Sequence, residues 1–237
     1  MIPVAGIPEV APGDDLAGLI AGSAEFLDGD VVVVAHKAVS KAEGRVVRLA
    51  EVKPSDRAGE LAGDEDARRV EVVLREARRI VRTRGPLVIA ETGHGFVCAS
   101  AGVDASNAPE PDAVVLLPVD PDASARGLRD RLIELTGTRV GVVVTDSFGR
   151  PWRLGTTDVA IGSAGIPVLL DLNGRRDAQG YELHATQIAV ADEIAGAAEL
   201  VRGKLDGVPV AIVRGLELEG DGSARDLVMP AHRDLFR

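Results

Sequence analysis

The chain has 237 residues, and its 27 lysines and arginines against 37 aspartates and glutamates give a net charge of −10 at pH 7. Hydrophobic residues make up 46% of the chain and there is one cysteine, which excludes a largely disordered protein, a disulfide framework and a zinc site built from several cysteines. We expect no nucleic-acid partner, which needs a basic surface, and no membrane span, since no apolar run approaches roughly 20 residues.

Five short apolar runs, rich in valine and bounded by glycine, proline or aspartate, predict buried strands. In chain order they are residues 31–35, 87–90, 114–117, 140–144 and 208–213. The runs are continuously apolar rather than alternating, so we expect elements to cover both faces of the sheet.

Three segments have the apolar periodicity of helices. The first is expected to begin after Ser55 as its N-cap and to continue to about Arg82, and the others span residues 124–135 and 185–201. Strands and helices alternate only loosely, which predicts an α+β (mixed α/β) fold rather than one wound sheet.

The residues at the two ends of the chain lead to two further predictions. Residues 1–15 lack the basic and apolar regions of a signal peptide, which predicts a cytoplasmic protein. Residues 217–237 are polar and irregular, so we expect a tail or linker after a folded unit of residues 1–216.

The sequence lacks the common catalytic and nucleotide motifs. It has no GxxxxGK[ST], no GxGxxG after a strand, no GxSxG and no HExxH. The four histidines show no metal-ligand spacing, so each by itself is more readily a structural or exposed residue than a ligand. They are His36, His94, His184 and His232.

A cluster of cations follows the first valine run. Lys37, Lys41 and Arg45, with the hydroxyl of Ser40, come directly after residues 31–35. Lysine is a compact point charge suited to phosphate, so the cluster can be an anion site. An ordinary exposed edge explains it equally well.

Two further clusters contain carboxylates. Small residues surround Asp104 and Asn107, which suits an oxygen-ligand site for Mg²⁺ or Mn²⁺, although a simple turn at Asp104 is the plainer interpretation of this cluster alone. Asp146 and Ser147 directly follow a buried run, where ligand sites of α/β sheets tend to lie, and a loop with two arginines and the only tryptophan comes next. Two carboxylates that hold metal ions and cations that hold phosphates together suit phosphoryl transfer.

The sequence resembles the coenzyme F420-0:L-glutamate ligases, also called coenzyme F420:gamma-glutamyl ligases. The blocks DGDVVVVAHKAVSKAEGRVV, AGVDASN, TDSFGRPWRLGTTDVAIG and DLNGRRDAQGYEL carry the resemblance, and it runs from about Gly6 to Leu216. The resemblance implies an α+β ligase fold of two intertwined subdomains and a homodimer.

The resemblance also implies an activity. Such a ligase uses GTP to add L-glutamate to the lactyl carboxylate of coenzyme F420-0 through an acyl phosphate, and it can add further gamma-linked glutamates. Two Mn²⁺ or Mg²⁺ ions at each site and K⁺ are the implied cofactors. The alternatives are a related GTP-dependent carboxylate–amine ligase with another or modified coenzyme precursor, and a non-catalytic nucleotide-binding subunit.

Site residues follow from the resemblance position by position. The metal positions are Asp104, Asp146 and Ser147. The GTP positions are Ile7, Pro8, Glu9, Val10, His36, Lys41, Asn107 and Lys204. The catalytic residue itself is not assigned. From charge and position we further expect Arg150, Trp152 and Arg153 to bind the coenzyme.

Two positions depart from the family pattern. His36 stands where the family commonly has serine or threonine, and Ser100 stands where an asparagine is expected. The ending LVMPAHRDLFR resembles the linker that leads, in actinobacterial relatives, into a flavin-binding nitroreductase-like domain. The chain is therefore either a stand-alone ligase or the first part of a longer protein.

Overall fold

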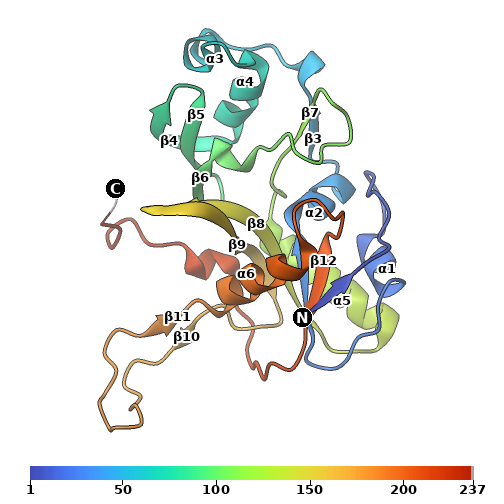
Figure 1. Cartoon of the computed structure of the whole chain (residues 1–237), viewed down its shortest axis with the longest axis vertical. Coiled ribbons are helices and arrows are strands. Elements are labelled where there is room, and N and C mark those ends of the chain that lie inside the picture. The colour runs from blue at the N-terminus through green and yellow to red at the C-terminus, as the bar shows by residue number, and fades with distance from the viewer. Residues whose placement is uncertain (236–237) are drawn as a thin grey trace.

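A five-stranded sheet in the order β1–β12–β2–β8–β9 forms the centre of the computed structural model, which describes residues 1–235 (Figure 1). The strands are β1 (Ile2–Val4), β2 (Val31–Ala35), β8 (Gly141–Arg150), β9 (Arg153–Ala164) and β12 (Val210–Val213). β2 and β8 are parallel, and the other neighbours are antiparallel. This mixed sheet with its helices confirms the α+β class.

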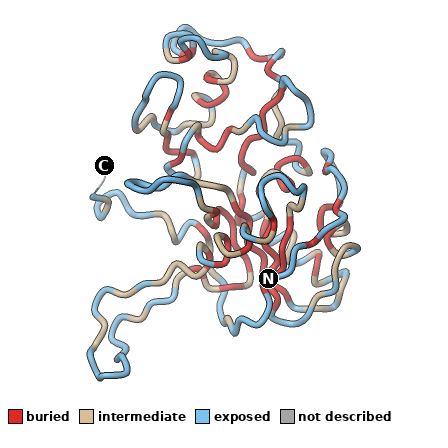
Figure 2. Tube along the Cα trace, viewed as in Figure 1, coloured by how far each residue is buried: buried red, intermediate tan, exposed pale blue. Residues whose placement is uncertain are grey.

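Both faces of the central sheet are buried, as the continuous valine runs predict (Figure 2). The covering helices are α1 (Leu16–Ala21), α2 (His36–Ala42), α5 (Pro121–Thr136) and α6 (Val190–Arg202). Val32 and Val34 of β2 pack in one core with apolar residues of α1, α2 and α5. Val31 and Val33 pack in a second core with the alanines of α6. Because successive side chains of a strand point to opposite faces, an all-valine strand requires a layer on each side.

Residues 46–116 form an insert with a hydrophobic core of its own, at the top of Figure 1. Its elements are β3 (Val46–Arg48), η1 (Leu49–Glu51), α3 (Asp56–Ala62), α4 (Ala67–Glu76), β4 (Ala77–Arg84), β5 (Leu87–Thr92), β6 (Val97–Ala99), η2 (Ser100–Gly102) and β7 (Ala113–Val115). The chain enters and leaves the insert at one point, where the Leu116 amide donates to the Arg45 carbonyl at 3.0 Å. Insert and central sheet are thus two subdomains.

The helix expected from Ser55 to Arg82 is wrong in its length and in its second half. Ser55 does cap α3, since its side chain accepts from the Ala58 amide. Gly63 then ends α3 with φ +58, and Asp66 caps the separate helix α4. Residues 77–84 form β4, which pairs with β5. The backbone hydrogen bonds of this hairpin override the helical periodicity of the segment.

The helix expected at residues 124–135 is confirmed as the core of α5, whereas the one expected at 185–201 begins later, at Val190. Gln187–Ile188 instead form β11, which pairs with β10 (Leu170–Asp171) at the base of an arm that projects from the body (Figure 1). The strand expected at 208–213 begins only at Val210. Pro209 has no amide to donate to a ladder, although its carbonyl accepts from the Ala35 amide.

The segment after Leu216 is polar, as expected, but from Asp221 to Val228 it is held on the body rather than leading away from it. The 3₁₀ helix η3 (Ala224–Leu227) begins with a buried Ala224, whose amide donates to the buried carboxylate of Asp122. Residues 236–237 of the expected tail lie outside the described residues. Among the described residues, no helix combines the length and the apolar character needed to cross a bilayer.

Candidate functional site

A cavity of about 460 Å³ opens where β2 ends beside β8. The parallel ladder stops at the pair Ala35–Thr145, after which β2 turns into α2 while β8 continues to Arg150. Asp146 and Ser147 therefore lie within β8, not after its end as the sequence suggested, because β9 continues to pair with them. They are nevertheless at the carboxyl end of the parallel pair, where a sheet leaves room for a ligand.

The cavity collects residues from distant parts of the sequence. Its lining includes every expected GTP position together with two expected metal positions: Ile7, Pro8, Glu9, Val10, His36, Lys41, Asn107, Asp146, Ser147 and Lys204. Asp104 does not line it. Asp104 instead contacts Lys37, which does, so the three metal positions lie around one region of the molecule without all facing the same space.

Two lysines of α2 face the cavity, and both contact a carboxylate. The Lys41 ammonium is buried and pairs with Glu9, and the Lys37 ammonium donates to Asp104 at 2.6 Å. Arg45, the third cation of this cluster, does not line the cavity. It donates to the Leu117 carbonyl at 2.9 Å and therefore stabilises the junction with the insert.

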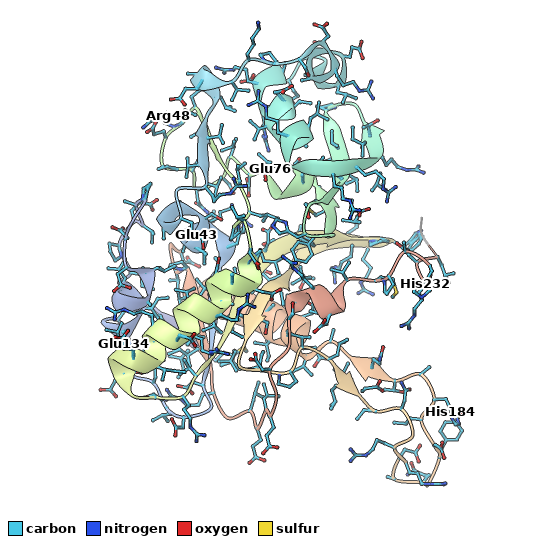
Figure 3. All side chains as sticks on the ribbon, turned by 180° about the vertical axis from the view of Figure 1, so that it is seen from behind. Glu43, Arg48, Glu76, Glu134, His184 and His232 are labelled. Carbon is cyan, nitrogen blue, oxygen red and sulfur yellow. The ribbon has the colours of Figure 1, made fainter. Side chains whose placement is uncertain are left out.

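His36 is buried at the start of α2, 2% exposed, and its Nε2 lies 3.2 Å from Asp146 Oδ1 without hydrogen-bond geometry. Its Nδ1 lies 3.3 Å from Ser40 Oγ. His94 has the expected structural role, since its Nε2 lies 3.0 Å from the Pro118 carbonyl oxygen. His184, on the β10–β11 arm, and His232, near the C-terminal end, lie apart from each other and do not line the cavity (Figure 3).

The floor of the cavity contains a buried ion pair that the sequence analysis missed. Asp158 of β9 and Arg202 at the end of α6 are 5% and 4% exposed, and the Arg202 guanidinium donates to the Asp158 carboxylate. Burial lowers the pKa of Arg202, against the opposing effect of Asp158. The sequence signals only one partner of this pair, because Asp158 is the one charged residue of residues 154–164. Arg202 is one of several charged residues in α6, so only its place in space reveals the pairing.

Comparison with known proteins identifies the family. The family model described as F420-0:Gamma-glutamyl ligase matches residues 6–215. The chain belongs to this family. It is 52% identical to the coenzyme F420:L-glutamate ligase of Methanopyrus kandleri, over 97% of this chain and 94% of that protein. The proteins of the same name from Archaeoglobus fulgidus and Methanothermobacter thermautotrophicus are each 44% identical, over 100% of this chain and 96% and 98% of theirs. The chain is thus an acid–amino-acid ligase.

The oxygen donors that Asp146 and Ser147 bring to the cavity form a small set. Among residues 1–235, no three His, Cys, Asp or Glu side chains are grouped closely enough to hold an ion by themselves. Asp146 and Ser147 offer a carboxylate and a hydroxyl oxygen beside one another. Mg²⁺ typically takes one or two carboxylates and completes its shell with water and substrate phosphates, which agrees with so small a protein set.

The hairpin of β8 and β9 places Arg150, Trp152 and Arg153 at its tip, and none of the three lines the cavity. Trp152 is 81% exposed and has a left-handed φ of +55. The structure therefore does not bring these residues to the other expected positions, and their contact with the coenzyme stays a prediction.

Ser100, the second departure from the pattern of these ligases, begins a run of left-handed residues. Ser100 and Ala101 have φ values of +52 and +51. Asparagine tolerates this region better than serine or alanine does, so the expected asparagine would suit the backbone of Ser100.

Proposed function

We propose that the chain is a GTP-dependent ligase that joins L-glutamate to the lactyl carboxylate of coenzyme F420-0 and can add further gamma-linked glutamates. The family and the names of its relatives support the coenzyme and the amino acid. The observation that carries the nucleotide is the cavity in which Lys41 and Lys204 meet Asp146. Cations and an oxygen ligand in one cavity suit a triphosphate with its metal.

In this proposal both the insert and the central sheet with its covering helices contribute to nucleotide binding. Lys37 and Lys41 neutralise phosphate charge from α2, Lys204 does so from beyond α6, and residues 7–10 with Asn107 contact the rest of GTP. Asp104, Asp146 and Ser147 would hold two Mn²⁺ or Mg²⁺ ions, with K⁺ as a further cofactor. The ions would supply charge neutralisation on the reacting phosphate.

The chemistry proceeds in two displacements. An oxygen of the lactyl carboxylate attacks the γ-phosphorus of GTP, the bond from that phosphorus to the β,γ-bridging oxygen breaks, and GDP leaves. The glutamate amine then attacks the acyl carbon of the acyl phosphate, an amide bond forms, the amine loses a proton, and inorganic phosphate leaves. The residues of this chain mainly position charged groups, which is the usual contribution of a protein to phosphoryl transfer.

A homodimer belongs to the same proposal. The β8–β9 hairpin and the β10–β11 arm carry exposed apolar side chains that a single chain leaves in water, among them Leu154 at 99% and Tyr181 at 64% exposure. Exposed apolar groups gathered on projecting segments favour an interface. Light scattering after size exclusion would report twice the 24.7 kDa mass of the chain.

Mass spectrometry of a reaction mixture tests the proposed activity. Coenzyme F420-0, GTP, L-glutamate and Mn²⁺ are incubated with the protein, and we expect a product heavier by one glutamate residue, with heavier species if addition repeats. Parallel reactions with other amino acids and with modified precursors test the alternative of a related carboxylate–amine ligase, and a reaction with ATP tests the choice of nucleotide. No such product, beside an active relative that makes it, would refute the proposal.

A further inference from the structure

Two hydroxyl groups of β8 share one buried carboxylate at the floor of the cavity. Thr145 Oγ1 lies 2.8 Å from Asp158 Oδ2, and Ser147 Oγ lies 2.6 Å from Asp158 Oδ1. Each hydroxyl also contacts a cation, since Arg202 Nη2 lies 3.0 Å from Thr145 Oγ1 and Lys204 Nζ lies 3.2 Å from Ser147 Oγ. Both hydroxyls are therefore placed between a cation and the same carboxylate.

The direction of each hydroxyl proton follows from the chemistry of these partners. Ammonium and guanidinium groups donate only, and an ionised carboxylate accepts only. The single proton of Ser147 must therefore point to Asp158, and Lys204 must donate to the Ser147 oxygen. The proton of Thr145 points to Asp158 for the same reason, while Arg202 donates to the Thr145 oxygen.

The fold holds Asp158 firmly in this place. Asp158 lies directly opposite Ser147 in the β8–β9 ladder, which brings the two side chains to the same face. Its amide lies 3.3 Å from Glu199 Oε2, and its carboxylate pairs with Arg202 at the end of the same helix. The ion pair is buried on both sides, so neither partner can turn to water without leaving the other uncompensated.

We propose that Asp158, held by Arg202, is a positioning residue that keeps the Ser147 proton on its own carboxylate at the cavity floor, so that this proton does not point at a bound ligand. Ser147 Oγ then presents only a lone pair to a ligand. It can bind a cation or accept from an N–H or O–H group, but it cannot donate to a phosphate oxygen. The inference rests on the proposed function, in which a divalent cation lies at Ser147, and it explains why a hydroxyl serves there as a ligand.

The variant Asp158→Asn tests this directly because it keeps the shape and reverses one hydrogen bond. The amide oxygen must face Arg202, which donates only, so the amide NH₂ group faces Ser147 and donates to it. The Ser147 proton is then released from Asp158 and competes with a cation in the cavity. We expect Mn²⁺ binding, followed by electron paramagnetic resonance with and without GTP, to weaken roughly 10–100-fold, the usual effect of removing a partner of a metal ligand.

A double-mutant cycle separates a positioning effect of Asp158 on Ser147 from an unspecific disturbance of the site. Ser147→Ala should weaken Mn²⁺ binding, and adding Asp158→Asn to it should change little further, because Asp158 acts through Ser147. Additive losses, unchanged Mn²⁺ binding in folded Asp158→Asn, or unchanged binding in Ser147→Ala would each overturn the inference. Circular dichroism establishes that the variants are folded.

Lys204→Met keeps the inference testable if Asp158→Asn does not fold, since Lys204 is exposed. Removing this donor should leave Mn²⁺ binding to the nucleotide-free protein unchanged or tighter, because Asp158 still orients Ser147 and a competing cation is gone. Weaker Mn²⁺ binding would show that Lys204 orients Ser147 and would overturn the inference. The wild-type product assay with GTP reports separately on the proposed function, so the two can fail independently.

Discussion

Lys37 Nζ lies 2.6 Å from Asp104 Oδ2, although the two residues are 67 positions apart. The contact joins α2 to the insert, and Ser106 completes it with its amide and hydroxyl. Burial raises the pKa of Asp104, but the hydrogen bonds from Lys37 and Ser106 outweigh it and lower the pKa to about 2. The carboxylate is thus ionised at neutral pH and is already matched by a cation of the protein.

The first prediction follows from this contact, because a divalent cation and Lys37 would compete for Asp104. Lys37→Met should tighten Mn²⁺ binding to the nucleotide-free protein and weaken GTP binding, each by about tenfold, or 1.4 kcal/mol. Titration calorimetry measures both. Lys53→Met, at an exposed lysine outside the cavity, is the matched control. If Lys37→Met left both affinities unchanged, or changed both in the same direction, Lys37 and the cation would not compete for Asp104.

Asp146→Asn should abolish turnover while the fold remains intact. In the wild type the Ser147 N–H donates to Asp146 Oδ1 at 2.8 Å, and the amide oxygen of the variant can still accept this bond. The variant side chain lacks the negative charge that a divalent cation requires. We expect product formation to fall by at least about 100-fold. Mass spectrometry measures the product and thermal unfolding monitors the fold. Retained activity would remove Asp146 from the metal role.

Arg150→Ala and Arg153→Ala test whether the hairpin tip contacts the coenzyme. If these cations bind its phosphodiester, each variant should raise the KM for coenzyme F420-0 by about tenfold and leave the KM for GTP unchanged. Steady-state kinetics with each substrate varied in turn separates the two constants. Arg57→Ala, an exposed arginine on α3, serves as the control. An unchanged KM for the coenzyme in both hairpin variants would refute the assignment.

Asp122→Ala should destabilise the protein by releasing residues 221–228. Asp122 is 3% exposed, and its carboxylate accepts from the Ser163 amide, the Ala224 amide and the Ser223 hydroxyl at 2.6 to 2.9 Å. Leaving these donors unmatched should cost about 3 kcal/mol, which corresponds to a fall in Tm of roughly 6–12 °C for a chain of this size. Calorimetry measures the shift. Asp130→Ala, at an exposed position of α5, should change little. An equal Tm for both variants would contradict the proposed role of Asp122 in holding residues 221–228.

Acidification should weaken the contact between α3 and α4 through Glu71. Hydrogen bonds from Ser55, and then from Arg75, lower the pKa of Glu71 from 4.5 to about 2. Since the folded-state pKa is the lower one, the unfolded chain binds more protons between these values, and the stabilisation is complete above about pH 4.5 and is lost as the pH falls toward 2. The stability difference between wild type and Glu71→Gln, measured by urea unfolding, should shrink over that interval. A constant difference from pH 7 to pH 3 would contradict it.

Local sequence patterns predicted the elements whose burial or ends are visible in the order of residue types. The valine runs indicated a sheet covered on both faces, and Ser55 indicated the start of α3. The prediction failed where a partner strand decided the outcome. Residues 77–84 have a helical apolar period, yet they form β4 because β5 lies beside them.

The sequence by itself determined the family, the α+β class and the blocks of polar residues that line the cavity, since motif order and residue type are linear properties. Only the tertiary structure decided which of those residues share a space. It brings Lys41, Lys204 and Asp146 together, leaves Arg45 at the junction with the insert, and places Asp158 under Ser147. Hydrogen bonds and ion pairs depend on distance in space, and β-pairing and helix packing set that distance in ways that spacing along the chain does not record.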